Sequence, residues 1–477
     1  MKSSASLNPH PLELEDVATR LTALAASGRE AALRSARPVL VSLTFECAAV
    51  PALSVFHAAR FQTRMFWRQP DDNKTMVGAG SAVSCEGSGE SRFEDIRLAH
   101  HRLVSEARVA ACSSYPLAAP VALGGFAFDP GAPPNPAWDG QPDALLVVPK
   151  FLFMTANDAS WCTVNLQMSG DSDPDGEVED VLAGLEVLLA AADDLPADEQ
   201  PPLWAMTDGA GRLWTDKVER ILDGIRRGEV QKVVLARELH LRGRDEIDAD
   251  AALRRLSETS DHCVLFAIDT AAGCMLGATP ERLVRLEGRT VKVDCLAGST
   301  ARGDDEAGDR LLATSLLGSD KDRREHGWVV NTLREALSAF CSSLHVPDSP
   351  RLLQLSDVQH LHTPLQGTLN GGQGVLDLVA NLHPTPGVGG VPRAAALDWI
   401  RRQEGLGRGW YAGPIGWVDA QGGGEFVVGI RSALLRGTDA WLYAGCGIVE
   451  GSDPQREYEE SVLKLQTMLA SLSEKAP

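Results

Sequence analysis

The stretch YAGCGIVEGSDPQREYEESVLK, residues 443–464, predicts a β-strand that runs directly into an α-helix. The strand carries apolar residues between glycines, and the Ser-Asp-Pro segment at 452–454 is typical of a helix start. In that helix Glu457, Glu460 and Lys464 follow one another at spacings of three and four residues, so their side chains share one face. The stretch therefore predicts two carboxylates and an ammonium beside a glycine-rich strand end.

Outward from this stretch, strands occur in antiparallel-looking runs with helices grouped between them. Strict alternation of strand and helix is missing, which indicates an α+β protein. We expect helices at 11–36, 177–192, 214–228, 249–258, 304–317, 320–343, 375–382, 392–404 and 454–473. We expect strands at 38–45, near 66–67 and 76–77, and at 121–128, 144–153, 161–167, 231–241, 262–269, 273–278, 283–287, 290–296, 351–368, 411–419, 425–436 and 440–449.

The composition indicates an acidic globular protein. The 477 residues include 65 Asp and Glu against 45 Lys and Arg, which gives a formal net charge of −20. Hydrophobic residues make up 44%, enough apolar surface to offset the ordering entropy of folding. The acidic balance argues against nucleic acid or an anionic membrane as a partner, because both need a basic patch. The length allows about two to four ordinary domains or one unusually large one, and the segment 193–207 is the best candidate for a linker.

The cysteines and the N-terminus indicate a cytoplasmic protein. The nine cysteines are scattered and form no CxxC motif, which argues against a disulfide framework or a zinc site. The first residues lack the apolar stretch of a signal peptide, and no apolar run is long enough to cross a membrane. We therefore expect reduced thiols and no membrane partner.

Two ionisable residues next to apolar strands are candidates for acid–base catalysis. Lys232 lies in the apolar strand QKVVLAR at 231–237, where partial burial would let it act as a general base. Glu281 follows a strand and a proline in ATPERL at 278–283, where burial would let it act as a general acid. On the pattern alone, Lys232 also fits an edge-strand lysine with a solvated ammonium, and Glu281 fits a solvated turn residue.

Three glutamates from two helices form a candidate magnesium site. Glu325 stands on the helix at 320–343, and Glu457 and Glu460 share a face of the last helix. Mg²⁺ prefers oxygen ligands and keeps several waters, so three carboxylates suit it. The alternative is an ordinary surface ion pair between Glu460 and Lys464, which contributes little stability.

Glycines and an arginine indicate a pocket for a small polyanion. Gly445 and Gly447 stand at a strand end, where backbone N–H groups are exposed. The glycine turn at 422–424 leads to Arg431 in the middle of the strand 425–436, and a strand arginine can fork onto a carboxylate. Turn glycines and a solvent-facing arginine fit the same pattern.

Taken in order, these motifs resemble those of the chorismate-utilising enzymes, and specifically isochorismate synthases of the menaquinone type. The motif-dense match covers about 214–473, over half of the chain, and looser similarity reaches the N-terminal third through FWR at 66–68 and GGFAFDP at 124–130. The number, order and spacing of the motifs make the resemblance specific. The matching segments are QKVVLAR at 231–237, GATPERLV at 277–284, CLAGSTARG at 295–303, KDRREH at 321–326, VQHLHTPLQG at 358–367, LHPTPGVGG at 382–390, RGWYAGPIGW at 408–417, GEFVVGIRSALL at 424–435 and YAGCGIVEGSDPQREYEE at 443–460.

The resemblance implies the chorismate-binding fold of anthranilate synthase component I, with large antiparallel sheets and flanking helices. It implies one large domain over 1–477, with an N-terminal part at 1–205 and a motif-dense catalytic part at 206–477, so that 193–207 becomes an internal connection. The implied activity is that of an isomerase, the reversible Mg²⁺-dependent conversion of chorismate to isochorismate. Water adds at ring carbon C2 and the C4 hydroxyl leaves. The implied pathway is menaquinone biosynthesis, with siderophore biosynthesis as the alternative.

Residue by residue, the resemblance implies a catalytic pair, a metal site and a substrate site. Lys232 would activate the water, and Glu281 would protonate the departing hydroxyl. Glu325, Glu457 and Glu460 would hold Mg²⁺. The positions that match the family's substrate-binding residues are Gly298, His360, Tyr411, Arg431, Gly445, Gly447 and Lys464, with a structural role as the alternative for His360.

Related chemistries differ at single positions. Anthranilate synthases typically have glutamine in place of Lys232, and aminodeoxychorismate synthases have a nucleophilic lysine in place of Ala297. Salicylate synthases share Lys232 and Glu281, so a salicylate-forming lyase stays open, and His362 departs from the small or apolar residue expected there. A non-catalytic chorismate-binding subunit is a further alternative. As partners the resemblance implies chorismate, a monomeric chain and no obligate glutamine amidotransferase subunit.

Overall fold

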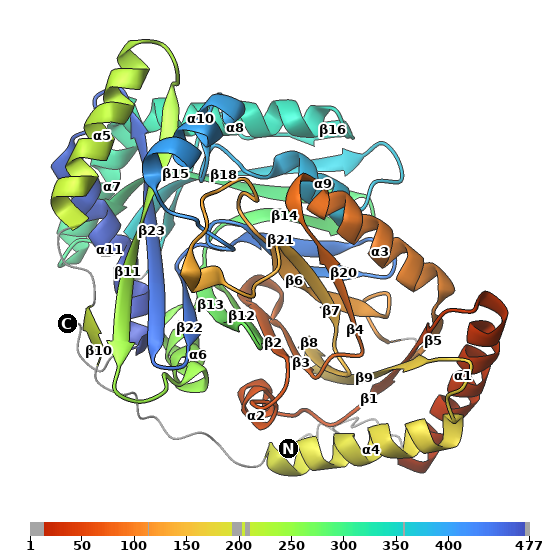
Figure 1. The fold of residues 1–477 in the computed structure, drawn as a ribbon. Helices are drawn as coiled ribbons and strands as arrows, with labels where there is room; N and C mark the ends of the chain where they lie inside the picture. The colour runs from red at the N-terminus through yellow and green to blue at the C-terminus, as the bar shows by residue number, and fades with distance from the viewer. Residues whose placement is uncertain (1–13, 113, 193–202, 206–209, 356–357, 473–477) are drawn as a thin grey trace, which may run out of the picture.

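The computed structural model describes residues 14–112, 114–192, 203–205, 210–355 and 358–472. In this part of the chain, helices surround two large β-sheets (Figure 1). Neighbouring strands among these residues pair antiparallel, with β1 and β5 as the parallel exception. The predicted α+β class is confirmed.

The first sheet contains 13 strands within the described residues, and its strands come from both halves of the chain. Along its main path the order is β10 (Leu203–Ala205), β11 (Lys232–Gly243), β23 (Asp439–Val449), β22 (Ser432–Arg436), β13 (Gly273–Thr279), β12 (Val264–Thr270), β2 (Arg64–Gln69), β3 (Lys74–Ala79), β8 (Phe151–Ala156), β9 (Ala159–Met168), β1 (Val39–Glu46) and β5 (Arg108–Ala111). The short strand β19 (Gly390–Val391) pairs with the start of β11.

The second sheet contains ten strands in the part of the chain that the structure describes. Its order is β16 (Cys341–His345), β18 (Val358–Leu369), β15 (Thr290–Ala301), β14 (Arg282–Glu287), β21 (Gly424–Val428), β20 (Pro414–Asp419), β6 (Val121–Phe126), β7 (Ala144–Val148) and β4 (Val83–Gly87), with β17 (Arg351–Gln354) beside β18. This sheet also draws on both halves of the chain.

The helices cover the edges and outer faces of the sheets. In Figure 1, α1 and α4 lie together beside β1 and β9, whereas α5 and α11 flank β11 and β23 at the opposite end. None of the helices in the described residues is long and apolar enough to cross a membrane. The helices are α1 (Leu14–Ser35), α2 (Ala52–Ala58), α3 (Arg92–Glu106), α4 (Pro174–Ala191), α5 (Ala210–Arg226), α6 (Ala249–Thr259), α7 (Glu306–Gly318), α8 (Asp320–Ser338), α9 (Val375–Leu382), α10 (Arg393–Trp399) and α11 (Pro454–Leu472), with the short turns η1 (Pro70–Asp72), η2 (Gly89–Ser91), η3 (Pro136–Trp138) and η4 (Ile400–Glu404).

Two hydrophobic clusters hold these layers together. One joins buried side chains of both sheets with those of α3, α5, α8 and α9, and includes Trp67, Phe126 and Trp410. The other joins the opposite face of the first sheet with α1, α4, α6 and α11. Burial of this apolar surface is the main favourable term in folding, so the strands that carry the site are fixed from both sides.

The two halves of the chain pair strand to strand. β2 pairs with β12 in the first sheet, and β6 pairs with β20 in the second. Most of the candidate linker 193–207 lies outside the described residues, but Leu203–Ala205 form strand β10 on β11, so these three residues are not linker. Their apolar side chains, Leu203 and Trp204, follow the prolines that suggested a linker.

The position of Arg431 corrects the sequence-based prediction of a single strand over 425–436. β21 ends at Val428 in the second sheet, and β22 begins at Ser432 in the first. Between them Arg431 has a φ of 50°, a left-handed conformation that side chains rarely adopt. Both strands are buried and apolar, so the sequence carries no sign that the chain crosses between sheets here.

Four other predicted elements are each two elements in the structure. The strand 351–368 is the hairpin β17–β18, and the strand 144–153 covers parts of β7 and β8. The helix 320–343 comprises α8 and the start of β16, and the helix 392–404 comprises α10 and the π-helical turn η4. The prediction also lacks α2, α3, β4 and β5, which are short or carry polar residues that interrupt the apolar period. The other predicted elements agree with the structure apart from shifts at their ends, and the predicted helical residues 11–13 and 473 lie outside the described residues.

Candidate active site

One cavity lies where β11, β23, α8 and α11 meet the connection between β13 and β14. The structure brings to this cavity every residue to which the sequence assigned a site role. These residues are Lys232, Glu281, Gly298, Glu325, His360, Tyr411, Arg431, Gly445, Gly447, Glu457, Glu460 and Lys464.

Lys232 is a buried lining residue of the cavity and is paired with a carboxylate. It is the first residue of β11, only 1% exposed, and its Nζ lies 2.8 Å from Oε1 of Glu325 on α8. Strand alternation places Val234 on the same cavity wall. The solvated edge-strand alternative is therefore wrong, because the ammonium is enclosed.

Glu281 faces the same cavity from the β13–β14 connection. Its backbone is fixed on both sides, since its N–H donates to Thr279 Oγ1 at 3.3 Å and its carbonyl accepts from the N–H of Val428 at 3.0 Å. Burial raises the pKa of Glu281 to about 8, an effect that Lys232 opposes. Among the described residues, no side chain or backbone group hydrogen-bonds to its carboxyl. The geometry is that of a neutral acid held ready to donate a proton.

The three glutamates predicted to bind metal each have a lysine partner. Glu325 pairs with Lys232, Glu457 pairs with Lys321 at 2.9 Å, and Glu460 pairs with Lys464 at 2.7 Å. Burial and the neighbouring charge of Glu460 raise the pKa of Glu457. Three carboxylates therefore converge on one cavity, with lysines compensating their charge.

The tightest cluster of possible metal ligands differs from the predicted set by one residue. The ligand atoms of Glu457, Glu460 and Cys446 lie within 4.8 Å of one another, and Glu325 is outside this group. Burial raises the pKa of the Cys446 thiol well above its ordinary value, and its S–H donates to the carbonyl of Glu457 at 3.2 Å. A protonated, already bonded thiol is a poor ligand, so the oxygen donors remain the candidates.

Cationic and neutral polar groups line the same cavity as the carboxylates. Lys464 donates to the carbonyl of Gly445 at 3.0 Å, and Arg431 reaches the cavity from the crossing between the sheets. Burial and the positive charges of Arg431 and Lys464 lower the pKa of His360 well below its ordinary value. Its neutral ring shares a 2.9 Å hydrogen bond between Nδ1 and Oγ of Ser299.

Tyr411 belongs to a row of stacked aromatic rings at the cavity edge. Its ring stacks on Tyr443 with centroids 5.0 Å apart, and Tyr443 stacks on Trp138 at 5.8 Å. Burial raises the pKa of Tyr411 to about 12, so its hydroxyl is neutral and available as a donor. The stacking fixes the direction in which that hydroxyl points.

Several cavity residues were missed by the sequence reasoning. Lys321 lies in the quoted segment KDRREH and Tyr443 opens the quoted segment YAGCGIVEG, but neither was assigned a role. Arg408 is fully buried, pairs with Glu404 at 2.6 Å and donates to the carbonyl of Val234 at 2.7 Å. The i, i+4 spacing of Glu404 and Arg408 was the available signal for this pair.

His362 does not line the cavity. It lies within strand β18, and its Nε2 is 2.8 Å from Oδ1 of Asp294 on the neighbouring strand β15. The unexpected histidine is therefore a partner of a carboxylate beside the site, and it makes no wall for a substrate.

Comparisons with known proteins agree with this geometry. A model of the chorismate binding enzyme family matches residues 26–473. Isochorismate synthase MenF of Bacillus subtilis is 36% identical over 449 residues, which cover 91% of this chain and 93% of that protein. The salicylate biosynthesis isochorismate synthase of Pseudomonas aeruginosa is 39% identical over 448 residues, which cover 92% of this chain and 91% of that protein.

A solved structure shows the same fold. The menaquinone-specific isochorismate synthase MenF from Escherichia coli is similar with a TM-score of 0.76 at 26% identity, over 94% of this chain and 99% of that chain. The expected chorismate-binding fold is thus confirmed. The family model and both relatives span nearly the whole chain, and the chain belongs to the family of chorismate-binding enzymes.

Proposed function

We propose that this protein is an isochorismate synthase, an isomerase that converts chorismate reversibly to isochorismate. The observation that carries the proposal is the enclosure of a lysine and a carboxylic acid, Lys232 and Glu281, in one cavity lined by cationic groups. The full-length relatives named isochorismate synthase support the same activity.

The reaction needs a base for the attacking water and an acid for the departing hydroxyl. Lys232, in its neutral amine form, takes a proton from the water that adds at C2, and Glu281 donates a proton to the hydroxyl that leaves C4. The raised pKa of Glu281, about 8, means that its carboxyl carries the proton needed at neutral pH. In the reverse direction the two residues exchange roles.

Chorismate carries two carboxylates, and the cationic side chains of the cavity suit them. Arg431 and Lys464 supply positive charge, Tyr411 and the neutral His360 supply directed polar contacts, and Gly298, Gly445 and Gly447 allow close approach to backbone N–H groups. Burial disfavours the charged form of Lys464, but Glu460 beside it holds its pKa above the ordinary value, so the ammonium stays charged. A dianion can thus be bound by a protein of net charge −20.

The oxygen donors of the cavity fit a divalent cation, and the family implies a metal-dependent reaction in general. We propose Mg²⁺ as that metal, with Glu325, Glu457 and Glu460 as its protein ligands, because it prefers carboxylate oxygens and water. The raised pKa of Glu457 reflects like charges that a cation would relieve. When bound, Mg²⁺ would supply positive charge against a substrate carboxylate.

Removal of divalent cations is expected to stop turnover. Excess EDTA should reduce the rate of isochorismate formation to background, and added Mg²⁺ should restore it, because the lysine partners alone do not replace a divalent charge. The measurement is the initial rate before and after dialysis against EDTA. Full activity in the presence of the chelator would refute the metal site.

Gly447 is expected to tolerate no side chain. A Cβ at this position would overlap the Glu325 carboxylate and lie 2.7 Å from Cε of Lys232, so the pair would have to move. Displacement of a reacting group by about 1 Å costs on the order of 10²-fold in rate, and we expect this loss in kcat for Gly447→Ala. Gly372→Ala is the control, because an added Cβ there meets nothing within 4 Å. Equal kcat values for the two variants would contradict the assigned geometry.

Product analysis tests the proposed function directly. The protein is incubated with chorismate and Mg²⁺, and the products are separated by chromatography. Isochorismate as the main product is expected. Salicylate and pyruvate as main products would instead assign a lyase, and absence of turnover would assign a non-catalytic chorismate-binding subunit.

The biological setting is part of the proposal. Likeness to the menaquinone-specific enzyme supports a place in menaquinone biosynthesis, with siderophore biosynthesis as the second candidate because the salicylate-pathway relative is 39% identical, against 36% for MenF of Bacillus subtilis. The nine cysteines form no disulfide, and five of them are buried, which supports the cytoplasm as the compartment. Strands before residue 205 pair with strands after it, which supports one large domain over 1–477.

We further propose a monomer that needs no glutamine amidotransferase subunit.

A further inference from the structure

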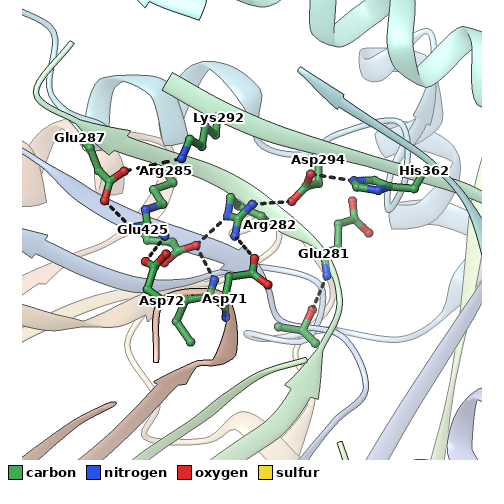
Figure 2. A network of polar contacts seen from close by, with 12 residues as sticks. Asp71, Asp72, Glu281, Arg282, Arg285, Glu287, Lys292, Asp294, His362 and Glu425 are labelled. Carbon is green, nitrogen blue, oxygen red and sulfur yellow. Dashed lines mark hydrogen bonds and ion pairs between the residues drawn. The ribbon is translucent and has the colours of Figure 1, made fainter. Parts of the chain in front are cut away.

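A row of charged side chains crosses the second sheet beside Glu281 (Figure 2). Arg282 on β14 donates to Oδ2 of Asp294 on β15 at 2.9 Å, and Oδ1 of the same aspartate lies 2.8 Å from Nε2 of His362 on β18. All three side chains lie outside the lining of the cavity, so the proposed chemistry has not used them.

The hydrogen bonds of His362 define its charge. Nε of Arg351 donates to Nδ1 of His362 at 3.2 Å, and a guanidinium N–H can only donate. Nδ1 therefore accepts, and the ring proton lies on Nε2, which donates to Asp294. The imidazole is neutral in this arrangement, so it orients the aspartate without cancelling its negative charge.

Arg282 neutralises Asp294 only in part. The same guanidinium also pairs with Glu425 at 2.7 Å and with Asp71 at 3.0 Å, so a single positive charge faces three carboxylates. Figure 2 shows this convergence on Arg282. Asp294 thus retains negative charge, and its side chain is only 14% exposed, where water screens that charge weakly.

The backbone brings Glu281 next to this row. Glu281 immediately precedes Arg282, and the pairing of β14 with β21 is irregular between Arg282 and Val284. Such an irregularity changes the direction in which the neighbouring side chains point. In Figure 2 the Glu281 carboxyl points toward the side of the sheet where Asp294 meets His362.

The charges that face Glu281 come from three elements. Burial raises the pKa of its carboxyl, Asp294 from β15 adds to this, and Lys232 from β11 and Lys464 from α11 oppose it. The Cys295 thiol nearby is neutral, because burial raises its pKa well above the ordinary value. Asp294 therefore favours the protonated form of Glu281, as burial does.

We propose that Asp294, oriented by His362 and Arg282, is a positioning residue whose fixed negative charge keeps the Glu281 carboxyl protonated for proton donation. This inference rests on the proposed function. Asp294 touches no reacting atom and acts only through Glu281. This role depends on the neutral form of His362, because a charged imidazole at this position would cancel the negative charge of Asp294.

The test is the pH profile of Asp294→Asn. A general acid is active in its protonated form, so activity falls as pH rises through its pKa. Removal of the Asp294 charge lowers that pKa, and we expect the alkaline limb of kcat to move to lower pH by roughly one unit. The plateau at lower pH should stay close to wild type. Asp294→Ser removes the same charge if the asparagine variant is insoluble.

A matched control variant and a second measurement distinguish a failure of this inference from a failure of the proposed function. Asp269→Asn removes an arginine-paired carboxylate of similar burial, which pairs with Arg64 at 2.7 Å away from the cavity, and its profile should match wild type. Difference infrared spectroscopy follows the protonated carboxyl band that Glu281→Gln removes, without any turnover. An unmoved alkaline limb and band in Asp294→Asn would overturn the inference, whereas a wild-type protein that makes no isochorismate would overturn the proposed function instead.

Discussion

Lys232→Met is expected to lower kcat for isochorismate formation by about 10²–10⁴-fold, the usual worth of a general base. Methionine keeps the length and volume of the lysine stem but cannot take a proton from water. Lys232 is 1% exposed, so no bulk water or buffer base can replace it at the same place. The initial rate with saturating chorismate and Mg²⁺ measures the loss.

Lys74→Met separates this effect from the loss of any buried ammonium. Lys74 is also buried, at 6% exposure, but its Nζ lies over the ring of Trp417, outside the cavity. We expect this variant to retain wild-type kcat. Wild-type turnover in Lys232→Met, or an equal loss in both variants, would remove Lys232 from its assigned role.

Glu281→Gln is expected to lower kcat by a similar factor, about 10²–10⁴-fold, because an amide cannot donate a proton to the departing hydroxyl. The variant should remain folded. In the native state the pKa of Glu281 is raised to about 8, above its ordinary value of 4.5, so stability is lost as pH rises between these two values. Glutamine carries no such penalty, and the thermal midpoint at pH 7 should not fall.

The pH profile of the wild-type enzyme adds a second measurement of the same residue. The protonated carboxyl is the active form, so kcat should decline as pH rises above about 8. Glu238→Gln serves as the control, because Glu238 on β11 accepts from Asn135 and lies outside the cavity. Full activity of Glu281→Gln would reject Glu281 as the acid.

Part of the cavity lining could be predicted from residue types and their spacing, whereas Gly298, His360 and Tyr411 were predicted only from the family resemblance. Glu457, Glu460 and Lys464 lie on one face of α11 as their spacing requires, and the strand at Lys232 points its lysine into the cavity. The α+β class followed in the same way, since antiparallel runs and grouped helices leave a visible pattern.

The partners of these groups could not be predicted, because they depend on contacts between distant segments. Lys321 reaches Glu457 from another helix, and Asp294 meets His362 across two strands that lie far apart in sequence. The left-handed turn at Arg431 was also hidden, since the apolar run on both sides continues through a change of sheet. Such features belong to tertiary geometry and leave little trace in local periodicity.

The pairing of β2 with β12 and of β6 with β20 has a consequence for how this enzyme can be divided or engineered. Every residue assigned to the cavity lies after residue 231, yet a fragment that begins near residue 206 would expose β12 and β20 as open edges. Exposed apolar edges recruit other chains and lead to aggregation. Strands β2 and β6 therefore cover edges that the catalytic part would otherwise expose, and new specificities are better sought by replacing cavity side chains than by exchanging halves between relatives.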